Sequence, residues 1–125
     1  MTVDLADRHE RVGDMFSLPT SSAEWNRLKL TDEQVAHYQT EGYVAGVRVL
    51  SDDQVDVLRE ELNAFFDPQH DGRELWYEYH ANESGDPNNV LFHALGAWRI
   101  APGMHDILWN PAFTVPASQL LEGAV

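Results

Sequence analysis

The sequence predicts an α+β fold, because two strongly signalled helices flank a β-prone segment and shorter elements follow them. Each helix opens with a capping box, in which a Ser or Thr side chain caps the third helical amide and that residue's Gln side chain reaches back. The two boxes are Thr31–Gln34 and Ser51–Gln54. The segment between the helices, residues 43–50, is rich in Val and aromatic or aliphatic side chains and favours a strand.

The first of these helices is expected over residues 32–41. Its apolar side chains Val35, Tyr38 and Ala36 would face the core, and Gly42 supplies the left-handed residue that commonly ends a helix. Residues 43–50 then form the predicted strand, which Gly46 weakens or bulges.

The second helix, expected over residues 52–66, has the most regular pattern in the chain. Its apolar residues recur at steps of three and four, which places them on one face. They are Val55, Leu58, Leu62 and Phe65. The acids of the same segment, Glu60 and Glu61 among them, are expected in water on the opposite side.

The remaining segments carry weaker signals. Residues 67–89 are polar and irregular, with a short strand expected over 75–79, and short helices are expected over 90–98, 104–109 and 116–122, the last with Pro116 near its first position. Residues 1–29 are expected to form a flexible N-terminal arm. Because 21 of the last 38 residues are apolar and the run continues almost to the end, the chain is expected to be a truncated part of a larger domain.

The charge distribution excludes several classes of function. The formal net charge is −13, and residues 31–87 hold 14 acidic but only three basic side chains. Such a surface repels nucleic acid and anionic membranes, because phosphate binding needs clustered Lys and Arg. The sequence shows no signal peptide and no apolar run of membrane-spanning length, so we expect a cytoplasmic protein. The absence of cysteine excludes disulfides, thiolate metal sites and Cys nucleophiles.

No catalytic residue and no metal ligand is predicted from the motifs. None of the six histidines lies in His-x-Asp, His-x-Glu or His-Glu-x-x-His, and there is no nucleophile elbow, Ser-x-x-Lys or glycine-rich phosphate loop. His80 with Glu78 or Glu83 could form an improvised metal site, but the simpler interpretation is that these are surface residues of a polar loop.

Trp98 and Arg99 are the candidate ligand-binding residues. Arg99 is the one basic residue among the last 38, and it lies in an apolar stretch. A guanidinium fork in such a setting can clamp a carboxylate through two hydrogen bonds. The alternative is a structural role, in which Arg99 pairs with Asp106 or caps the C-terminus of a helix.

Three stretches together resemble the start of the phytanoyl-CoA dioxygenase family. The first is LTDEQVAHYQTEGYV over residues 30–44, a helix that ends in a Gly-Tyr-Val turn. The second is VLSDDQV over residues 49–55, which opens a leucine-rich helix, and the third is LFHALGAWRI over residues 91–100. The resemblance covers residues 30–125, which would be the N-terminal portion of such a domain.

This resemblance implies helices and first strands of a double-stranded β-helix, a jelly-roll or cupin-like fold, with its barrel core incomplete. It implies an Fe(II)- and 2-oxoglutarate-dependent dioxygenase that hydroxylates a small organic substrate. The family's iron-binding His-x-Asp would follow Val125, so no metal ligand is assigned in this chain, and the chain alone is expected to be inactive. Trp98 and Arg99 fall where family members begin to line the co-substrate pocket.

Two other functions remain open at this stage. One is a stand-alone acidic scaffold or interaction module without catalysis, and the other is an unrelated α+β domain that binds a small molecule. For a dioxygenase, the acidic surface favours a small metabolite over a polyanionic CoA thioester. The chain alone is expected to self-associate through its apolar C-terminal part.

Overall fold

The computed structural model describes residues 2–123 and combines α-helices with a small antiparallel sheet, which confirms the α+β class. In chain order its helices and strands are α1 (Ser22–Arg27), α2 (Asp32–Glu41), α3 (Asp52–Ala64), β1 (Glu78–His80), β2 (His93–Leu95), α4 (Pro102–Asp106) and α5 (Pro111–Leu120). Short 3₁₀ turns lie at Arg73–Leu75, Ala97–Arg99 and Ile107–Trp109.

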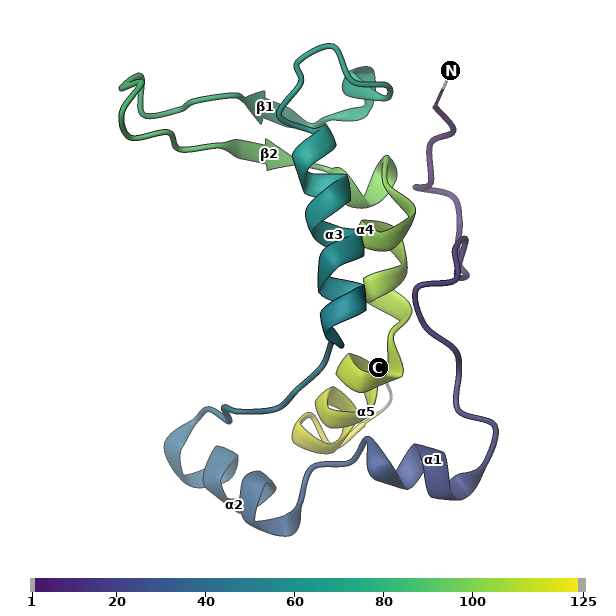
Figure 1. Ribbon diagram of the computed structural model, residues 1–125. Helices are drawn as coiled ribbons and strands as arrows, with labels where there is room; N and C mark the ends of the chain where they lie inside the picture. The colour runs from purple at the N-terminus through teal and green to yellow at the C-terminus, as the bar shows by residue number, and fades with distance from the viewer. Residues whose placement is uncertain (1, 124–125) are drawn as a thin grey trace.

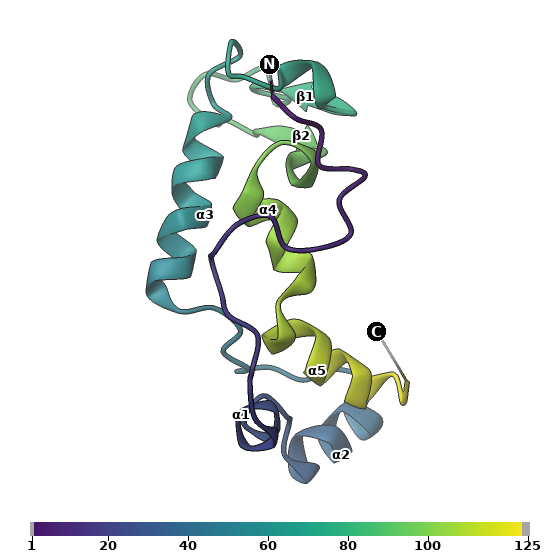
Figure 2. The same cartoon turned by 90° about the vertical axis from the view of Figure 1, so that its right-hand side faces the viewer.

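Helices α3 and α4 lie side by side along the middle of the molecule, with the β1–β2 hairpin at one end and α1, α2 and α5 at the other (Figure 1). The N-terminal segment runs along α4 before it reaches α1, as Figure 2 shows. Segments from both ends of the sequence therefore meet at α4.

Helix α2 has the bounds that its sequence predicts. The Thr31 hydroxyl accepts the Gln34 N–H at 3.2 Å and the Gln34 side chain accepts the Thr31 N–H at 2.9 Å, so the capping box is complete. Gly42 ends the helix with φ = 80°, a left-handed conformation that glycine adopts without strain. Val35 and Tyr38 are half-buried, whereas Ala36 is exposed.

Helix α3 also forms behind its predicted capping box, but part of its predicted facing is wrong. Phe65, at its C-terminal end, is 4% exposed and belongs to the core, as expected. Leu62 is 39% exposed, and Glu61 turns inward instead, where its carboxylate accepts the backbone N–H groups of Gly103 and Met104 at 2.7 and 2.9 Å. The reason is that α4 presents a polar N-terminus to this face of α3.

A small hydrophobic core joins α3 to the segment before α4. Phe65 packs with Ile100 and Ala101, and half-buried side chains surround them. The ring of Trp76 meets Phe65 edge to face, with centroids 4.8 Å apart. The Tyr79 hydroxyl donates to the Phe65 carbonyl at 2.7 Å, so the hairpin is fastened to the end of α3.

The predicted strand over residues 43–50 does not form. The segment is irregular, and the one sheet within residues 2–123 joins β1 to β2. A strand needs a partner to bond its backbone groups, and no other segment of the described chain supplies one here. Gly46, at φ = 75°, adds a left-handed bend.

The hairpin corrects two further predictions. The strand expected over 75–79 lies at Glu78–His80, after a 3₁₀ turn, and the helix expected over 90–98 is wrong because residues 93–95 pair with that strand. Phe92 explains the change: its ring packs on Phe66 and Tyr79, with centroids 4.7 and 5.6 Å away. Tertiary packing thus overrides the local helical preference.

At the C-terminal end the helices begin earlier than predicted. Helix α4 starts at Pro102 and continues into the 3₁₀ turn that ends at Trp109, near the predicted end. Helix α5 starts at Pro111, behind the N-cap Asn110, and contains Pro116 in its interior. Asn110 followed by proline is the stronger start signal, because the side chain accepts the Ala112 N–H at 2.9 Å.

The segment before α1 makes specific contacts. Leu5 and Phe16 are buried, and the Leu5 N–H donates to the Arg99 carbonyl at 2.9 Å. The division of the chain into an arm and a domain at residue 29 stays a prediction, but these contacts hold residues 2–16 against the rest. No helix within residues 2–123 is long and apolar enough to cross a membrane.

Candidate functional site

Arg99, the predicted carboxylate clamp, already holds a carboxylate. Its guanidinium donates to both oxygens of Asp4, with the Nε–Oδ1 distance at 3.2 Å, and to the Leu75 carbonyl at 2.9 Å. It also lies over the Tyr77 ring, 4.7 Å from the centroid. The hydrogen bond from Arg99 lowers the pKa of Asp4. Of the two structural alternatives, the ion pair with Asp106 is wrong because Asp4 of the N-terminal segment is the partner. The other, a cap on the C-terminus of a helix, agrees with the bond to Leu75, the last residue of the 3₁₀ turn Arg73–Leu75.

This arrangement bears on the fit of 2-oxoglutarate. A co-substrate carboxylate at Arg99 would have to take the place of Asp4, because the guanidinium fork is occupied on both sides. The adjacent Trp98 is half-buried in the same 3₁₀ turn. The role of Trp98 and Arg99 in co-substrate binding therefore stays a prediction.

The residues described here do not fit the iron that the resemblance implies. Within residues 2–123 no group of three or more His, Asp or Glu side chains is placed to hold a metal ion. His80 pairs with Glu78 at 2.9 Å, while Glu83 pairs with His93 at 2.9 Å. The two imidazoles face each other across the hairpin with centroids 5.7 Å apart, but the four side chains form two separate pairs.

No sequence pattern pointed to the buried polar cluster at His105 and Asp106. The Asp106 carboxylate accepts the backbone N–H groups of Val12 and Gly13, both at 2.8 Å, and lies 3.0 Å from His105 Nδ1. His105 Nε2 lies 3.1 Å from the Arg8 carbonyl. Burial acts to raise the pKa of Asp106, but the hydrogen bonds from His105, Val12 and Gly13 outweigh it, so the pKa is lowered. The cluster holds the N-terminal segment against α4, and its carboxylate and imidazole groups all have hydrogen-bond partners.

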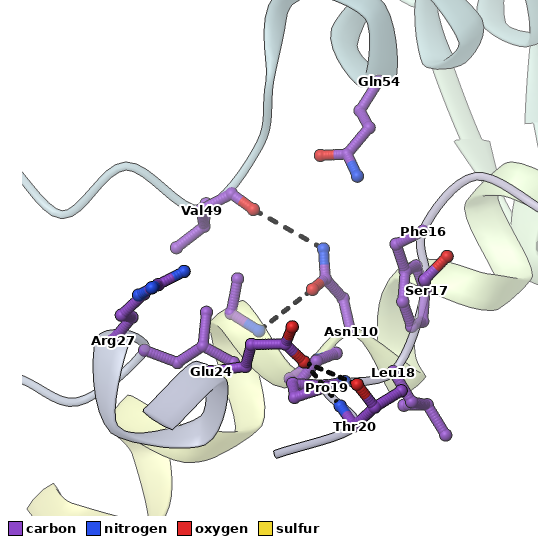
Figure 3. Close-up of a pocket in the computed structure, with 13 residues that line it drawn as sticks. Phe16, Ser17, Leu18, Pro19, Thr20, Glu24, Arg27, Val49, Gln54 and Asn110 are labelled. Carbon is purple, nitrogen blue, oxygen red and sulfur yellow. Dashed lines mark hydrogen bonds between the residues drawn. The ribbon is translucent and has the colours of Figure 1, made fainter. Parts of the chain in front are cut away.

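A hollow large enough for a small molecule lies between the N-terminal segment, α1 and the start of α5 (Figure 3). Its volume is about 510 Å³, within the usual range of ligand pockets. We call it the Asn110 pocket, after the side chain at its centre. Most of its wall is apolar, from Phe16, Leu18, Pro19, Leu28, Val49, Pro111 and Ala112.

The other six lining residues of the Asn110 pocket are polar, and most of their side chains are held by hydrogen bonds. Asn110 is 3% exposed, and its amide reaches the Val49 carbonyl only at 3.5 Å, the limit of a hydrogen bond. Glu24 accepts the N–H and hydroxyl of Thr20 at 2.6 and 3.1 Å, and these bonds lower the pKa of its carboxyl. Arg27 lines one side of the pocket (Figure 3).

No pattern in the sequence pointed to this pocket, since its wall comes from four separated segments. The buried Asn110 could have been noticed as the N-cap of α5, but its neighbours are set by tertiary packing. Comparison with known proteins adds no assignment, because no protein-family model matches this sequence and no curated protein matches it significantly.

Proposed function

We propose that this chain is the N-terminal portion of an Fe(II)- and 2-oxoglutarate-dependent dioxygenase that hydroxylates a small organic substrate. The observation that carries the proposal is the ordered pair of elements that resembles the phytanoyl-CoA dioxygenase family. A capped helix is followed by its C-cap Gly42 and by a segment without regular secondary structure, and a second capped helix begins after its N-cap Ser51. In this proposal α3 and α4 would cover the sheet of a double-stranded β-helix whose core lies beyond residue 125.

The described residues would have a supporting role in such an enzyme. They do not fit the iron, and the one arginine near the expected co-substrate pocket is paired with Asp4. No step of the reaction is therefore assigned to a side chain of this chain. Its contribution would be to hold the neighbouring elements in place and to form part of the substrate or co-substrate wall.

The test is to express the natural gene from its start codon to its stop codon and to compare the product with residues 1–125. With Fe(II), 2-oxoglutarate and oxygen, the complete product should form succinate, whereas residues 1–125 alone should not. In an anaerobic Fe(II) titration, residues 1–125 should show no saturable one-to-one binding at micromolar iron. Turnover by residues 1–125 alone, or none by a longer gene product that carries His-x-Asp, would overturn the proposal.

The alternative, an acidic interaction module without catalysis, has one observation in its favour. Large apolar side chains near the C-terminal end are exposed, among them Leu108 at 57% and Leu121 at 67%. Where such side chains form one contiguous patch, they are typical of surfaces that meet another protein. A natural stop codon directly after Val125, together with a chain that folds and stays inactive, would favour this module over the enzyme.

A further inference from the structure

Positive charge is scarce in this chain, yet three of its eight basic side chains line one small hollow. Arg27, Lys29 and Arg48 all belong to the wall of a cavity of about 230 Å³, which we call the basic hollow. Within residues 2–123 no acidic side chain belongs to that wall, although the whole chain has 21 Asp and Glu. Such a local excess of one sign of charge concentrates ions of the opposite sign.

The basic hollow adjoins the Asn110 pocket. Arg27, Leu28 and Ala112 line both cavities, so Arg27 lies between them. In Figure 3 Arg27 lies on one side of the Asn110 pocket and the apolar side chains of Phe16 and Leu18 lie on the other. The two cavities together offer a cationic end and a mostly apolar end, which matches a molecule with an anionic head and an apolar body.

The nearby acids limit the charge of the molecule that fits. Arg48 bonds to Asp52 at 2.8 Å, and Glu24 lines the Asn110 pocket beside Arg27. The charged side chains of the two walls, counted with Asp52 as the bonded partner of Arg48, are three positive and two negative, so this set carries one net positive charge. A monoanion balances that charge, whereas a phosphate dianion or a polyanion would meet the repulsion of Glu24 and Asp52.

The geometry points to a binding site for a small organic carboxylate, with its head at Arg27 and Lys29 and its apolar body in the Asn110 pocket. Arg48 adds positive charge to the wall, but its guanidinium already donates to Asp52 and to the Leu50 carbonyl. Guanidinium groups suit this role because their planar fork binds a carboxylate through two parallel hydrogen bonds. The apolar wall adds burial for a short hydrocarbon or aromatic body. The site does not depend on the dioxygenase proposal, because every residue in it belongs to the described chain.

Equilibrium dialysis of residues 1–125 against 4-phenylbutyrate tests the site, and 4-phenylbutanamide serves as a control with the same apolar body and no charge. We expect saturable binding of the carboxylate and at least about tenfold weaker binding of the amide, since a charge-assisted contact is lost. Inorganic phosphate should compete weakly. Equal binding of acid and amide, tighter binding of phosphate, or no saturable binding of the carboxylate would each overturn the assignment.

Matched variants locate the binding. Arg27→Gln and Lys29→Gln should each weaken 4-phenylbutyrate binding by about tenfold, by the same loss of a charge-assisted contact. Arg59→Gln removes the same charge from an exposed position on α3 that lines neither cavity, and it should leave binding unchanged. All three side chains are exposed, so the variants should fold, which circular dichroism checks. If Arg59→Gln weakened 4-phenylbutyrate binding equally, the effect would be one of general charge and the assignment of the site would be overturned.

Discussion

The Asp106 carboxylate accepts the backbone N–H of Gly13 at 2.8 Å, although the two residues are 93 positions apart in the sequence. Its other oxygen accepts the N–H of Val12 at the same distance. Asp106 is fully buried, so water does not compete for these bonds. A single side chain of α4 therefore satisfies two backbone donors of the N-terminal segment and holds the two parts together.

Asp106→Asn should destabilise the chain by about 1–3 kcal/mol. The amide that replaces one oxygen is a donor, so it would face a backbone N–H that is then left without an acceptor in a buried site. Urea denaturation followed by circular dichroism measures the change. Asp14→Asn, a change of the same kind at an exposed residue nearby, should cost less than about 0.5 kcal/mol. Equal effects of the two substitutions would contradict the role given to Asp106.

The lowered pKa of Asp106 predicts a loss of stability in acid. Its stabilising contribution is fully present above the unfolded-state pKa, which is near 3.8, and it is lost as the pH falls through the lower pKa of the folded state. Stability curves measured between neutral pH and about pH 2 should therefore fall more steeply for the native chain than for Asp106→Asn. Parallel curves would show that Asp106 keeps the same pKa in both states.

This link between α4 and the N-terminal segment was not predictable from sequence patterns. Capping boxes are local, and both were correct because each depends on four adjacent residues. Asp106 meets Gly13 only after the chain has folded, and nothing in the residues around either position indicates the partner. The same applies to Arg99, whose suitability for a carboxylate was visible in the sequence but whose partner, Asp4, was not.

Glu61→Ala should lower the free energy of unfolding by about 0.5–2 kcal/mol, the usual range for loss of an N-terminal helix cap. The Glu61 carboxylate caps α4 from outside by accepting the N–H groups of Gly103 and Met104. Gly103 allows the approach, since a Cβ there would lie 2.7 Å from Glu61 Oε2. Glu60→Ala, at an exposed neighbouring position, is the control and should change the free energy of unfolding by less than about 0.5 kcal/mol.

The capping role would be contradicted if Glu60→Ala lowered the free energy of unfolding as much as Glu61→Ala does. The two acids are adjacent and identical in chemistry, so sequence alone assigns both to solvent. The difference arises because one of them faces the N-terminus of α4, where unpaired backbone donors favour a carboxylate.

Among truncations in and directly after α3, Phe65→Ala should lower the free energy of unfolding most, by about 3–5 kcal/mol, because it leaves a cavity in the small core. Leu62→Ala should lower the free energy of unfolding by clearly less, since the Leu62 side chain is 39% exposed and its truncation removes little buried apolar surface. Chemical denaturation of both variants gives the comparison. If Leu62→Ala were as costly as Phe65→Ala, the side of α3 that bears Leu62 would be covered in solution.

The helix periodicity predicted Phe65 correctly and Leu62 wrongly for a physical reason. A stripe at steps of three and four identifies one face of a helix, but not how much of that face has something to pack against. Here the neighbouring α4 has only five residues, and it covers part of α3. The strand prediction for residues 43–50 was wrong for a similar reason. The composition of this segment suits a strand, but no segment within residues 2–123 pairs with it.

The chain exposes more surface than its mass would lead one to expect. Its accessible surface is 8537 Å², whereas a compact monomer of 14.2 kDa exposes roughly 6,800 Å² by the usual scaling. Within the described part, only six aliphatic or aromatic side chains and two prolines of α5 are buried. Large apolar side chains are exposed instead, including Leu91, Leu108, Trp109, Phe113 and Leu121.

Residues 1–125 in isolation should therefore self-associate or bind a hydrophobic dye. Exposed apolar side chains gain free energy when a second copy or a dye removes them from water, and the net charge of −13 slows association without covering them. Light scattering over a range of concentrations, with dye fluorescence at each, measures both effects. Leu108→Lys should reduce them, whereas Val57→Lys, an exposed apolar position on α3, should reduce them less. A chain that stays monomeric, binds no dye and unfolds in one cooperative step would show that these side chains are no docking surface, and it would favour a self-sufficient domain.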